Sequence, residues 1–387
     1  MTPDNHDVFS RPVSRWMEGR GPDADVVISS LVRLARNFAG VPFTLRMTKD
    51  QAQRLIDQVA APISQAHESG GEGPLGDLRL VRLGDLGRLQ RQVLVEKHLI
   101  SPQHAQDPNG AVAIRADQAM SLMINEEDHL RIQVICAALR LSEAFALCTA
   151  VDDALEESLD YAWDERYGYL TACPTNTGTA MRASVMLHLP GLVMTNQAGR
   201  LAGLIGKLNC VVRGMYGEGS EAAGNIFQVS NQITMGHTED EVLTGLVSLT
   251  TRLIQDEREA RASLLAEMRP HLEDRVWRAW GTLTCARVLS SREALKCISD
   301  LKLGADLAII KGLDGSVINS IMFTIRPAFL QLLHGEKLAP EERDMRRASL
   351  VRRQLAGAPP IKSDTADKQR PGQQPAGSGQ RGGDDER

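Results

Sequence analysis

Short apolar runs of strand length recur along the first third of this chain, and they constrain its fold more than any other feature. The runs cover residues 25–29, 92–95, 112–115, 121–124 and 131–135. Helix-length segments do not alternate with these runs at the spacing that parallel β-α-β units require. The sequence therefore predicts an α+β fold, with a mostly antiparallel sheet flanked by helices.

Helical periodicity dominates the chain after Thr238. Apolar residues recur at helical spacing over residues 239–266, 275–285, 292–301 and 317–333, and earlier over residues 48–61 and 141–161. We expect a domain boundary near residue 256, between a mixed domain (residues 1–256) and an all-helical C-terminal domain (residues 257–355). Residues 356–387 are rich in Pro, Gly, Gln and charge. Such a segment cannot bury enough apolar surface to fold, so we expect a disordered tail.

Charge and cysteine usage exclude several classes of protein. The 387 residues carry a formal net charge of -5, which argues against non-specific nucleic-acid binding. No apolar run approaches the ~20 residues that a membrane span requires, and the first residues lack the apolar core of a secretory signal. The six cysteines are scattered, without metal-ligand spacing. We therefore expect a cytoplasmic protein with reduced thiols, no metal site, and no nucleic-acid or membrane partner.

Two polar segments carry the residues most suited to chemistry. Residues 125–131 read NEEDHLR, which sets Glu126 and Glu127 beside Arg131. Residues 173–179 read CPTNTGT and are followed closely by Arg182. Either segment alone could be a solvated surface turn. Together they resemble the two signature blocks of the phosphagen (guanidino) kinases, which transfer the γ-phosphoryl group of ATP to a guanidinium nitrogen.

Phosphoryl transfer of this kind needs charge neutralisation and positioning more than covalent chemistry from the protein. Planar, always-charged arginine side chains suit phosphate oxygens well, although a lone arginine is more often a solvated surface residue. The resemblance implies that the chain binds ATP, with Mg²⁺ bridging the phosphates. The ATP contacts that it implies are Ser29, Ser30, Arg33, His98, Arg131, Arg182, Ala183, Ser184, Val185, Met186, Arg213, Gly214, Met215, Tyr216 and Gly217.

The resemblance also implies the catalytic residues. Glu127 matches the carboxylate that orients the substrate guanidinium and accepts its proton as the phosphoryl group arrives. Cys173 matches the reactive cysteine of the family, whose thiolate nearby arginines would favour, and a plain buried cysteine is the alternative. Glu218 offers a second carboxylate, although its glycine-rich setting would also suit a phosphate-side loop. Glu126 and Asp128 could instead hold the loop or a Mg²⁺-bound water.

Further segments resemble the bacterial protein arginine kinases of the McsB type. Residues 212–221 (VRGMYGEGSE) and 225–231 are similar to blocks of that family. The first block, at residues 29–33, begins too early to leave room for the helical domain that precedes it in kinases of free guanidines. Residues 343–348 (RDMRRA) match the R-D-x-x-R-A motif of the family, which forms an allosteric phosphoarginine pocket there. The residues that this implies are Arg343, Asp344, Arg346, Arg347 and Ala348; a solvated helix end is the alternative.

The McsB-type resemblance implies a role in stress response and protein quality control as well. Members of the family phosphorylate exposed arginines of protein substrates, and the phosphoarginine marks these proteins for a Clp-type AAA+ unfoldase and its protease. A zinc-binding activator protein and a heat-shock repressor are partners in the family. Its members form homodimers through the C-terminal helical domain. We expect the same partners and a homodimer here on the strength of the resemblance.

One position departs from the family pattern. The first block reads S-S-R-[IV]-R in the family, and Leu31 stands here in place of the first arginine. Because leucine can neither donate a hydrogen bond nor neutralise phosphate, the change is expected to weaken binding or catalysis by ~2–4 kcal/mol. Two readings follow: an active kinase, slower or weaker in ATP binding, and a catalytically weak or inactive relative that acts as a phosphoarginine-binding adaptor. A kinase of free arginine is a third.

Overall fold

The computed structural model describes residues 13–197, 205, 210–214, 223–335 and 337–356, together with Phe9 and Arg11. Of Arg213, Gly214 and Ala223 only the backbone is described. Four residues expected at the site, Met215, Tyr216, Gly217 and Glu218, lie outside the described residues. The predicted tail lies outside them too, from residue 357 onward.

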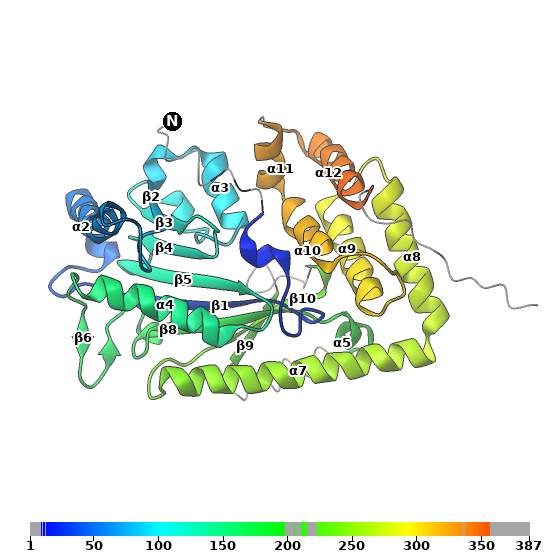
Figure 1. Cartoon of the computed structure of the whole chain (residues 1–387), viewed down its shortest axis with the longest axis horizontal. Coiled ribbons are helices and arrows are strands. Elements are labelled where there is room, and N and C mark those ends of the chain that lie inside the picture. Colours follow the sequence, from blue (N-terminus) through cyan, green and yellow to red (C-terminus); the bar gives the residue numbers. More distant parts are fainter. Residues whose placement is uncertain are drawn as a thin grey trace, which may run out of the picture.

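An eight-stranded sheet forms the centre of the structure, in the order β2-β3-β4-β5-β1-β8-β10-β9 (Figure 1). Every neighbouring pair of strands in it is antiparallel. The strands are β1 (Val27–Arg36), β2 (Leu78–Arg82), β3 (Ala111–Arg115), β4 (Met120–Ile124), β5 (Leu130–Ala137), β8 (Met181–His188), β9 (Cys210–Gly214) and β10 (Ile226–Asn231). The predicted α+β fold with a mostly antiparallel sheet is confirmed.

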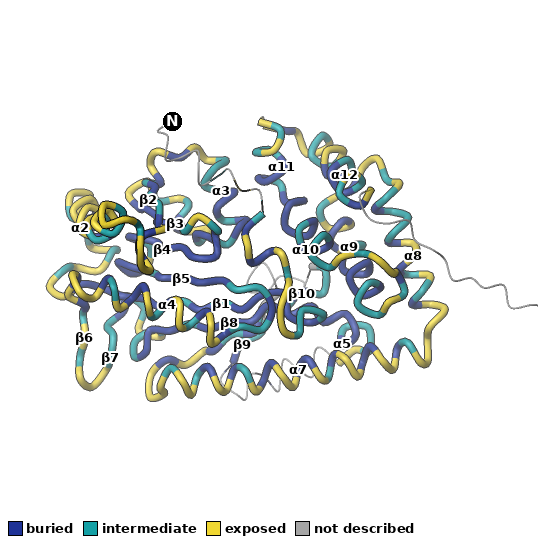
Figure 2. Tube along the Cα trace, in the orientation of Figure 1, coloured by how far each residue is buried: buried dark blue, intermediate teal, exposed yellow. Residues whose placement is uncertain are grey.

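Helices cover the two faces of this sheet differently. One face packs against α2 (Lys49–Glu68), α4 (Leu141–Glu156) and α7 (Glu239–Glu267), which share an apolar cluster with Val32 and Leu34 of β1. Part of the other face is buried against the C-terminal helices through Ile135 and Met186. Figure 2 shows the central strands buried along most of their length, whereas α7 alternates between buried and exposed residues.

The C-terminal part of the described chain is helical throughout. Its helices are α8 (Arg269–Cys285), α9 (Ser291–Asp306), α10 (Gly315–Thr324), α11 (Pro327–His334) and α12 (Pro340–Ala356). They lie together at one end of the sheet, and α7 leads to them from the face that it covers (Figure 1). The boundary expected near residue 256 falls inside α7, so the division into domains stays a prediction. In the described chain no single helix is long and apolar enough to cross a membrane, and only the bent pair of α10 and α11 passes that test jointly.

Two expectations about secondary structure are wrong. Residues 92–95 are not a strand but belong to α3 (Arg88–Glu96), where Val93 and Leu94 are buried. A short apolar run does not distinguish a strand from a buried helix, and neighbouring context decided it here. The single helix expected over residues 317–333 is α10 and α11, because Pro327 opens α11 and has no N–H to continue the helix before it.

The register of β1 places three arginines on one face of the sheet. Arg33 lies directly opposite Arg182 of β8, and Ala35 lies opposite Arg131 of β5. Side chains alternate between the two faces along a strand, and residues opposite each other share a face. Arg33, Arg131 and Arg182 therefore point to the same side, away from the face that packs on α4 and α7.

A buried glutamate joins α3 to the C-terminal helices. The carboxylate of Glu96 accepts hydrogen bonds from the backbone N–H groups of Ala328 and Phe329, both at 2.9 Å. These groups belong to the first turn of α11, whose N-cap residue, Arg326, provides no side-chain cap. Arg326 instead donates to the Glu96 carbonyl oxygen at 3.1 Å. Burial raises the pKa of Glu96, so the N–H groups and nearby arginines must stabilise the charged carboxylate.

A second buried glutamate makes the same contact elsewhere. Glu257 of α7 accepts hydrogen bonds from the N–H groups of Gly191 and Leu192, both at 2.9 Å. These groups open α5 (Pro190–Met194), which also begins with proline and lacks a side-chain cap. Arg261 donates to Glu257 at 2.6 Å and to the carbonyl oxygen of His188 at 3.1 Å. In both places a remote carboxylate supplies the acceptor that a helix N-terminus requires.

Replacing Glu96 with alanine leaves two buried N–H groups without their acceptor. We expect the free energy of unfolding to fall by about 2–4 kcal/mol, as measured by chemical denaturation. Glu259→Ala, the same change at an exposed position of α7, is the control and should change stability by less than about 0.5 kcal/mol. Equal losses in the two variants would show that the contact does not stabilise the junction.

Candidate active site

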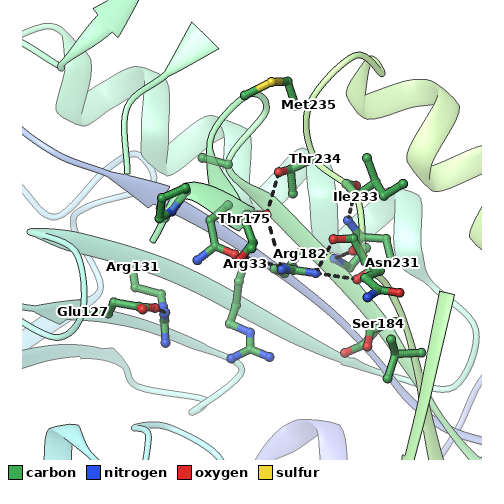
Figure 3. Close-up of a pocket in the computed structure, with 18 residues that line it drawn as sticks. Arg33, Glu127, Arg131, Thr175, Arg182, Ser184, Asn231, Ile233, Thr234 and Met235 are labelled. Carbon is green, nitrogen blue, oxygen red and sulfur yellow. Dashed lines mark hydrogen bonds and ion pairs between the residues drawn. The ribbon is translucent and has the colours of Figure 1, made fainter. Parts of the chain in front are cut away.

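The three arginines of the sheet line a cavity of about 830 Å³. Its walls come from β1, β5, β8 and β10, from residues 174–176, and from residues 232–235 after β10. Figure 3 shows Arg33, Arg131 and Arg182 at this cavity, with Glu127 beside Arg131. Positive side chains from three strands thus converge on one space, with a carboxylate at its edge.

Arg131 is held by two neighbouring carboxylates. Its guanidinium lies 2.8 Å from Glu126 and 3.1 Å from Glu127. The Glu126 side chain is only 2% exposed, and it also accepts hydrogen bonds from the Ser101 hydroxyl at 2.6 Å and from the Glu127 N–H at 2.7 Å. Burial alone would raise the pKa of Glu126, but Arg131 and these hydrogen bonds outweigh it and hold the pKa below its ordinary value. Glu126 therefore stays charged and positions Arg131.

Glu127 differs from Glu126 in its accessibility. Its side chain is 42% exposed and contributes to the cavity wall. Among the described residues its side chain pairs with Arg131, whereas Glu126 is enclosed by several donors. The expected catalytic carboxylate is thus the one of the pair that a ligand in the cavity could reach.

Arg182 is fixed mainly by backbone carbonyl groups. It donates to the carbonyl oxygens of Asn231 at 2.8 Å and Gln232 at 3.0 Å, and to the Asn176 side chain at 3.1 Å. The Asn231 side chain in turn bridges the Ala183 N–H and the Met181 carbonyl oxygen. These bonds fix the guanidinium at the wall of the cavity, where its positive charge suits an anion.

The loop that carries Cys173 forms another wall of the cavity. Residues 174–176 line it, and the Cys173 thiol lies 3.1 Å from the Thr175 hydroxyl. Thr234 secures this loop by donating to the carbonyl oxygens of Thr175 at 3.0 Å and Thr177 at 2.8 Å. Cys173 is half-buried next to the cavity and does not itself line it.

A buried network joins the Cys173 loop to the loop of Glu127. Asp128 is fully buried and accepts hydrogen bonds from the Asn37 side chain and from the Ala172 N–H, both at 2.7 Å. Asn37 also accepts from the His129 N–H at 3.0 Å. The His129 ring accepts from the Phe38 N–H through Nδ1, and burial lowers its pKa, which keeps it neutral. Asp128 thus sets the spacing between the two loops.

Sequence reasoning did not single out some of these positioning residues. Asn176 and Asn231 fix Arg182, and Asn37 holds Asp128. A signal existed for the first two, because Asn176 belongs to the CPTNTGT segment and Asn231 ends the 225–231 segment. Nothing in the sequence distinguishes Asn37 from an ordinary residue at a strand end.

Several expected ATP contacts lie away from the cavity. Ala183 and Ser184 line it, but Val185 and Met186 do not, since Val185 is buried in the core under α4 and α7 and Met186 under the C-terminal helices. Ser29 and Ser30 are buried as well, and the Ser30 hydroxyl donates to the Ala138 carbonyl oxygen at 2.8 Å. A consecutive run on a strand cannot face one ligand throughout, because alternate side chains point to opposite faces.

His98 lies behind the cavity wall. Its ring packs edge-on against Trp16 and Phe323, with centroids 5.8 and 6.4 Å away. Burial lowers its pKa to about 3, and the charges of Arg326 and Arg33 act in the same direction. The ring is therefore neutral at physiological pH. It does not line the cavity, and its nucleotide contact stays a prediction.

Leu31 occupies the same face of β1 as Arg33. It lies opposite Ile135 of β5 and Ser184 of β8. The side chain is half-buried against the apolar cluster beneath the C-terminal helices. The position that an arginine holds in the family pattern is therefore occupied here by an apolar side chain that packs toward the C-terminal helices.

The residues of the expected allosteric pocket lie on α12 but do not share one surface. Arg347 is buried, pairs with Asp344, and donates to the carbonyl oxygens of Ile325 at 2.9 Å and Leu289 at 2.7 Å. Ala348 is fully buried, whereas Arg346 is exposed and Arg343 half-buried. Arg347 thus fastens α12 to neighbouring segments, and the phosphoarginine pocket stays a prediction.

The glycine-rich segment of residues 212–221 is described only at its start. Arg213 and Gly214 end β9, where they lie opposite Gln228 and Phe227 of β10. The expected ATP contacts of Arg213 and Gly214 therefore fall on the edge strand of the sheet. The contacts expected of the next three residues, and the catalytic role expected of Glu218, concern residues that the structure does not describe.

The chain matches two family models that adjoin along the sequence. Residues 59–260 match "ATP:guanido phosphotransferase, C-terminal catalytic domain". Residues 269–369 match "Protein-arginine kinase McsB C-terminal domain". The first match contains the cavity residues of β5, β8 and β10, and the second contains α8 to α12.

Curated relatives resemble the chain over most of its length. The protein-arginine kinase of Moorella thermoacetica is 53% identical over 345 residues, which is 89% of this chain and 98% of that protein. The protein-arginine kinase of Bacillus subtilis is 46% identical over 343 residues, covering 89% of this chain and 93% of that protein. Both matches span the sheet and the C-terminal helices.

Solved structures share the fold at lower sequence identity. A lombricine kinase superposes with a TM-score of 0.55 and 21% identity, covering 64% of this chain and 70% of that one. A duplicated taurocyamine kinase from Schistosoma mansoni gives a TM-score of 0.52 and 24% identity, covering 62% of this chain and 34% of that one. At this identity the likeness concerns the fold alone.

The Asp128 network generates a structural prediction. Asp128→Ala removes the acceptor of the Ala172 N–H and of Asn37, so we expect faster hydrogen–deuterium exchange in residues 171–177 and a loss of about 1–3 kcal/mol in unfolding free energy. Asp128→Asn keeps one acceptor oxygen and should lose less.

The matched control is Asp153→Ala, at an exposed position of α4, which should leave exchange in residues 171–177 unchanged. Unchanged exchange there in Asp128→Ala would mean that Asp128 does not hold the Cys173 loop.

Proposed function

This chain belongs to the ATP:guanido phosphotransferase family and, within it, to the protein-arginine kinases of the McsB type, and we propose that it transfers the γ-phosphoryl group of ATP to arginine side chains of proteins. The observation that carries the proposal is the cavity in which Arg33, Arg131 and Arg182 converge beside the accessible carboxylate of Glu127. Three converging guanidinium groups suit a triphosphate, and a carboxylate suits a guanidinium substrate.

The chemistry assigns a separate task to each wall of the cavity. Arg33, Arg131 and Arg182 neutralise the phosphate oxygens and align the γ-phosphoryl group. Mg²⁺ enters with ATP, bound by phosphate oxygens, and neutralises charge on the triphosphate. Glu127 orients the substrate guanidinium by a paired hydrogen bond. The new N–P bond forms as the bond from phosphorus to the ADP oxygen breaks, and Glu127 accepts the guanidinium proton during that step.

Glu126, Asp128 and Cys173 act around this step. Glu126 keeps Arg131 aimed into the cavity through the 2.8 Å ion pair. Asp128 keeps the Cys173 loop beside the Glu127 loop. The Cys173 thiol lies next to residues of the cavity wall, near enough to the guanidinium site for the reactive role that the family resemblance implies.

The biological role extends the proposal. Phosphoarginine made by this chain marks proteins for a Clp-type AAA+ unfoldase in protein quality control under stress, with a zinc-binding activator protein and a heat-shock repressor as partners. The McsB-type C-terminal domain supports this role and a homodimer formed through the helical part. A cytoplasmic location is supported by the six cysteines, all of which are free thiols.

Leu31 favours a second candidate function. Its half-buried apolar side chain removes one positive charge from the phosphate-facing part of β1. A chain weakened in this way could serve as a phosphoarginine-binding adaptor through α12. The retention of Glu127 in an accessible position favours the kinase, because an adaptor has no chemical need for that carboxylate.

The central test replaces Glu127 with glutamine. We expect ³¹P NMR of an arginine-rich protein incubated with the chain, ATP and Mg²⁺ to show phosphoarginine, and Glu127→Gln to lower its rate of formation by about 10²- to 10⁴-fold. Glu143→Gln, at an exposed position of α4, is the control and should match the parent. Full activity of Glu127→Gln would remove Glu127 from the mechanism.

Restoring the family arginine provides a second test. Leu31→Arg adds a phosphate contact, so we expect kcat/KM for ATP to rise by about tenfold or more, as one charge-assisted hydrogen bond is worth about 1.5–3 kcal/mol. Leu31→Met, which keeps the apolar character, should resemble the parent in steady-state kinetics.

The two variants also separate the two candidate functions. No phosphoarginine from either the parent or Leu31→Arg, with both folded, would favour the adaptor. A Leu31→Arg variant no better than Leu31→Met would show that the position does not reach the phosphates.

A further inference from the structure

An exposed apolar turn stands beside the catalytic loop. It consists of residues 42–47 and contains the short 3-10 helix η2 (Thr44–Arg46). Leu45 is 91% exposed, the highest value among the large apolar side chains of the described chain, and Phe43 is 39% exposed. Single exposed apolar residues are ordinary on protein surfaces. Two exposed apolar side chains in one turn, beside the loop that carries Glu127, are less common and can indicate an interaction surface.

The turn is held in place by the loop that carries Glu127 and His129. The Thr44 hydroxyl donates to the backbone carbonyl oxygen of Glu127 at 2.5 Å. The Nε2–H of His129 donates to the Pro42 carbonyl oxygen at 2.8 Å. Val41, directly before the turn, and Met47, its last residue, are partly buried against the main apolar cluster. The turn therefore presents its apolar side chains from a rigid base, which lowers the entropy cost of binding.

The turn adjoins the loop that would hold a target arginine, because the Thr44 hydroxyl is bonded to the backbone of Glu127. The side chain of Glu127 lines the cavity, and Leu45 directly follows the threonine bonded to Glu127. An arginine side chain extends about 7 Å from its Cα. A substrate arginine that reaches Glu127 therefore leaves its own backbone at the rim of the cavity, and the residues one or two positions away fall beside the turn.

The size of the turn argues against another occupant. A stable interface between two copies of a chain needs about 1,000 Å² or more of buried surface, and two side chains on a convex turn offer far less. One apolar side chain of a peptide matches it better. The rest of the binding energy of such a peptide comes from its arginine, whose guanidinium group binds at the neighbouring Glu127.

We propose that the turn of residues 42–47 is a docking surface for an apolar side chain one or two positions from the target arginine in a protein substrate. The inference rests on the proposed function and refines it. The chain distinguishes among arginines by what stands next to them. An arginine beside a leucine or phenylalanine is preferred over an arginine with polar neighbours.

Two matched peptides test this preference. Each carries one arginine, flanked on both sides by leucine in one peptide and by serine in the other. We expect the leucine-flanked peptide to have a kcat/KM about five- to tenfold higher, and a Kd lower by a similar factor, since partial burial of one leucine side chain is worth about that much. Phosphoarginine formation gives the first value, and fluorescence anisotropy of labelled peptides gives the second.

The variant Leu45→Ser then locates the preference. We expect it to bring the ratio between the two peptides close to one, without changing kcat/KM for the serine-flanked peptide. Leu333→Ser, at a 48% exposed position of α11 far along the chain, is the control and should keep the full ratio. A ratio that survives Leu45→Ser would overturn the proposal.

Other outcomes also decide the question. If Leu45→Ser converts an oligomer into a monomer in sedimentation experiments and the ratio is unaffected, the turn is a self-association surface and the proposal is wrong. If no phosphoarginine forms on either peptide, the proposed kinase function fails. The ratio of the two Kd values still tests the docking surface in that case, so the two failures are distinguishable.

Discussion

The site depends on the pairing of β1 with β5 on one side and with β8 on the other. This pairing brings Arg33 opposite Arg182 and puts Arg131 on the same face. Three like charges repel one another, so the fold must supply compensation before any ligand arrives. Glu126 compensates Arg131, and backbone carbonyl oxygens after β10 hold Arg182. The neighbouring loops therefore owe much of their conformation to the need to position these guanidinium groups.

The parts of the chain that flank the sheet are joined by a second recurring contact. Glu96 and Glu257 each accept the N–H groups of a helix that opens with proline and has no cap of its own. Proline suits the first helical position, but it leaves the next N–H groups in need of an acceptor. Supplying that acceptor from a distant helix turns a local requirement into a tertiary contact. The short helices α5 and α11 are thereby tied to α7 and α3.

The fold class and the residues at the centre of the site could be predicted from the sequence. Most of the residues that hold those side chains in position could not. Glu127, Arg131 and Arg182 could be singled out because their segments resemble the signature blocks of the phosphagen kinases, and the structure brings all three to one cavity. Asn37 and Asp128 could not be paired, because they are 91 positions apart along the chain and meet only through the sheet. The strand expected at residues 92–95 is part of a helix instead, because a short run with three apolar residues fits a buried helix equally well. The side chain of Val185 lies in the core because residues alternate between the two faces along β8, so its expected ATP contact stays a prediction. Arg347 was expected in an anion pocket; its Nε and Nη1 donate to backbone carbonyl groups, and the pocket stays a prediction.

The ion pair between Arg131 and Glu127 has a thermodynamic consequence for the two substrates. In the free protein each of these groups satisfies the other at 3.1 Å. A phosphate that draws Arg131 away leaves Glu127 available to a guanidinium, and a guanidinium that engages Glu127 leaves Arg131 available to a phosphate. Under the roles proposed for Arg131 and Glu127, each ligand removes a competitor of the other, so we expect their affinities to be linked. By reciprocity, the factor by which ATP tightens the binding of an arginine equals the factor by which that arginine tightens the binding of ATP.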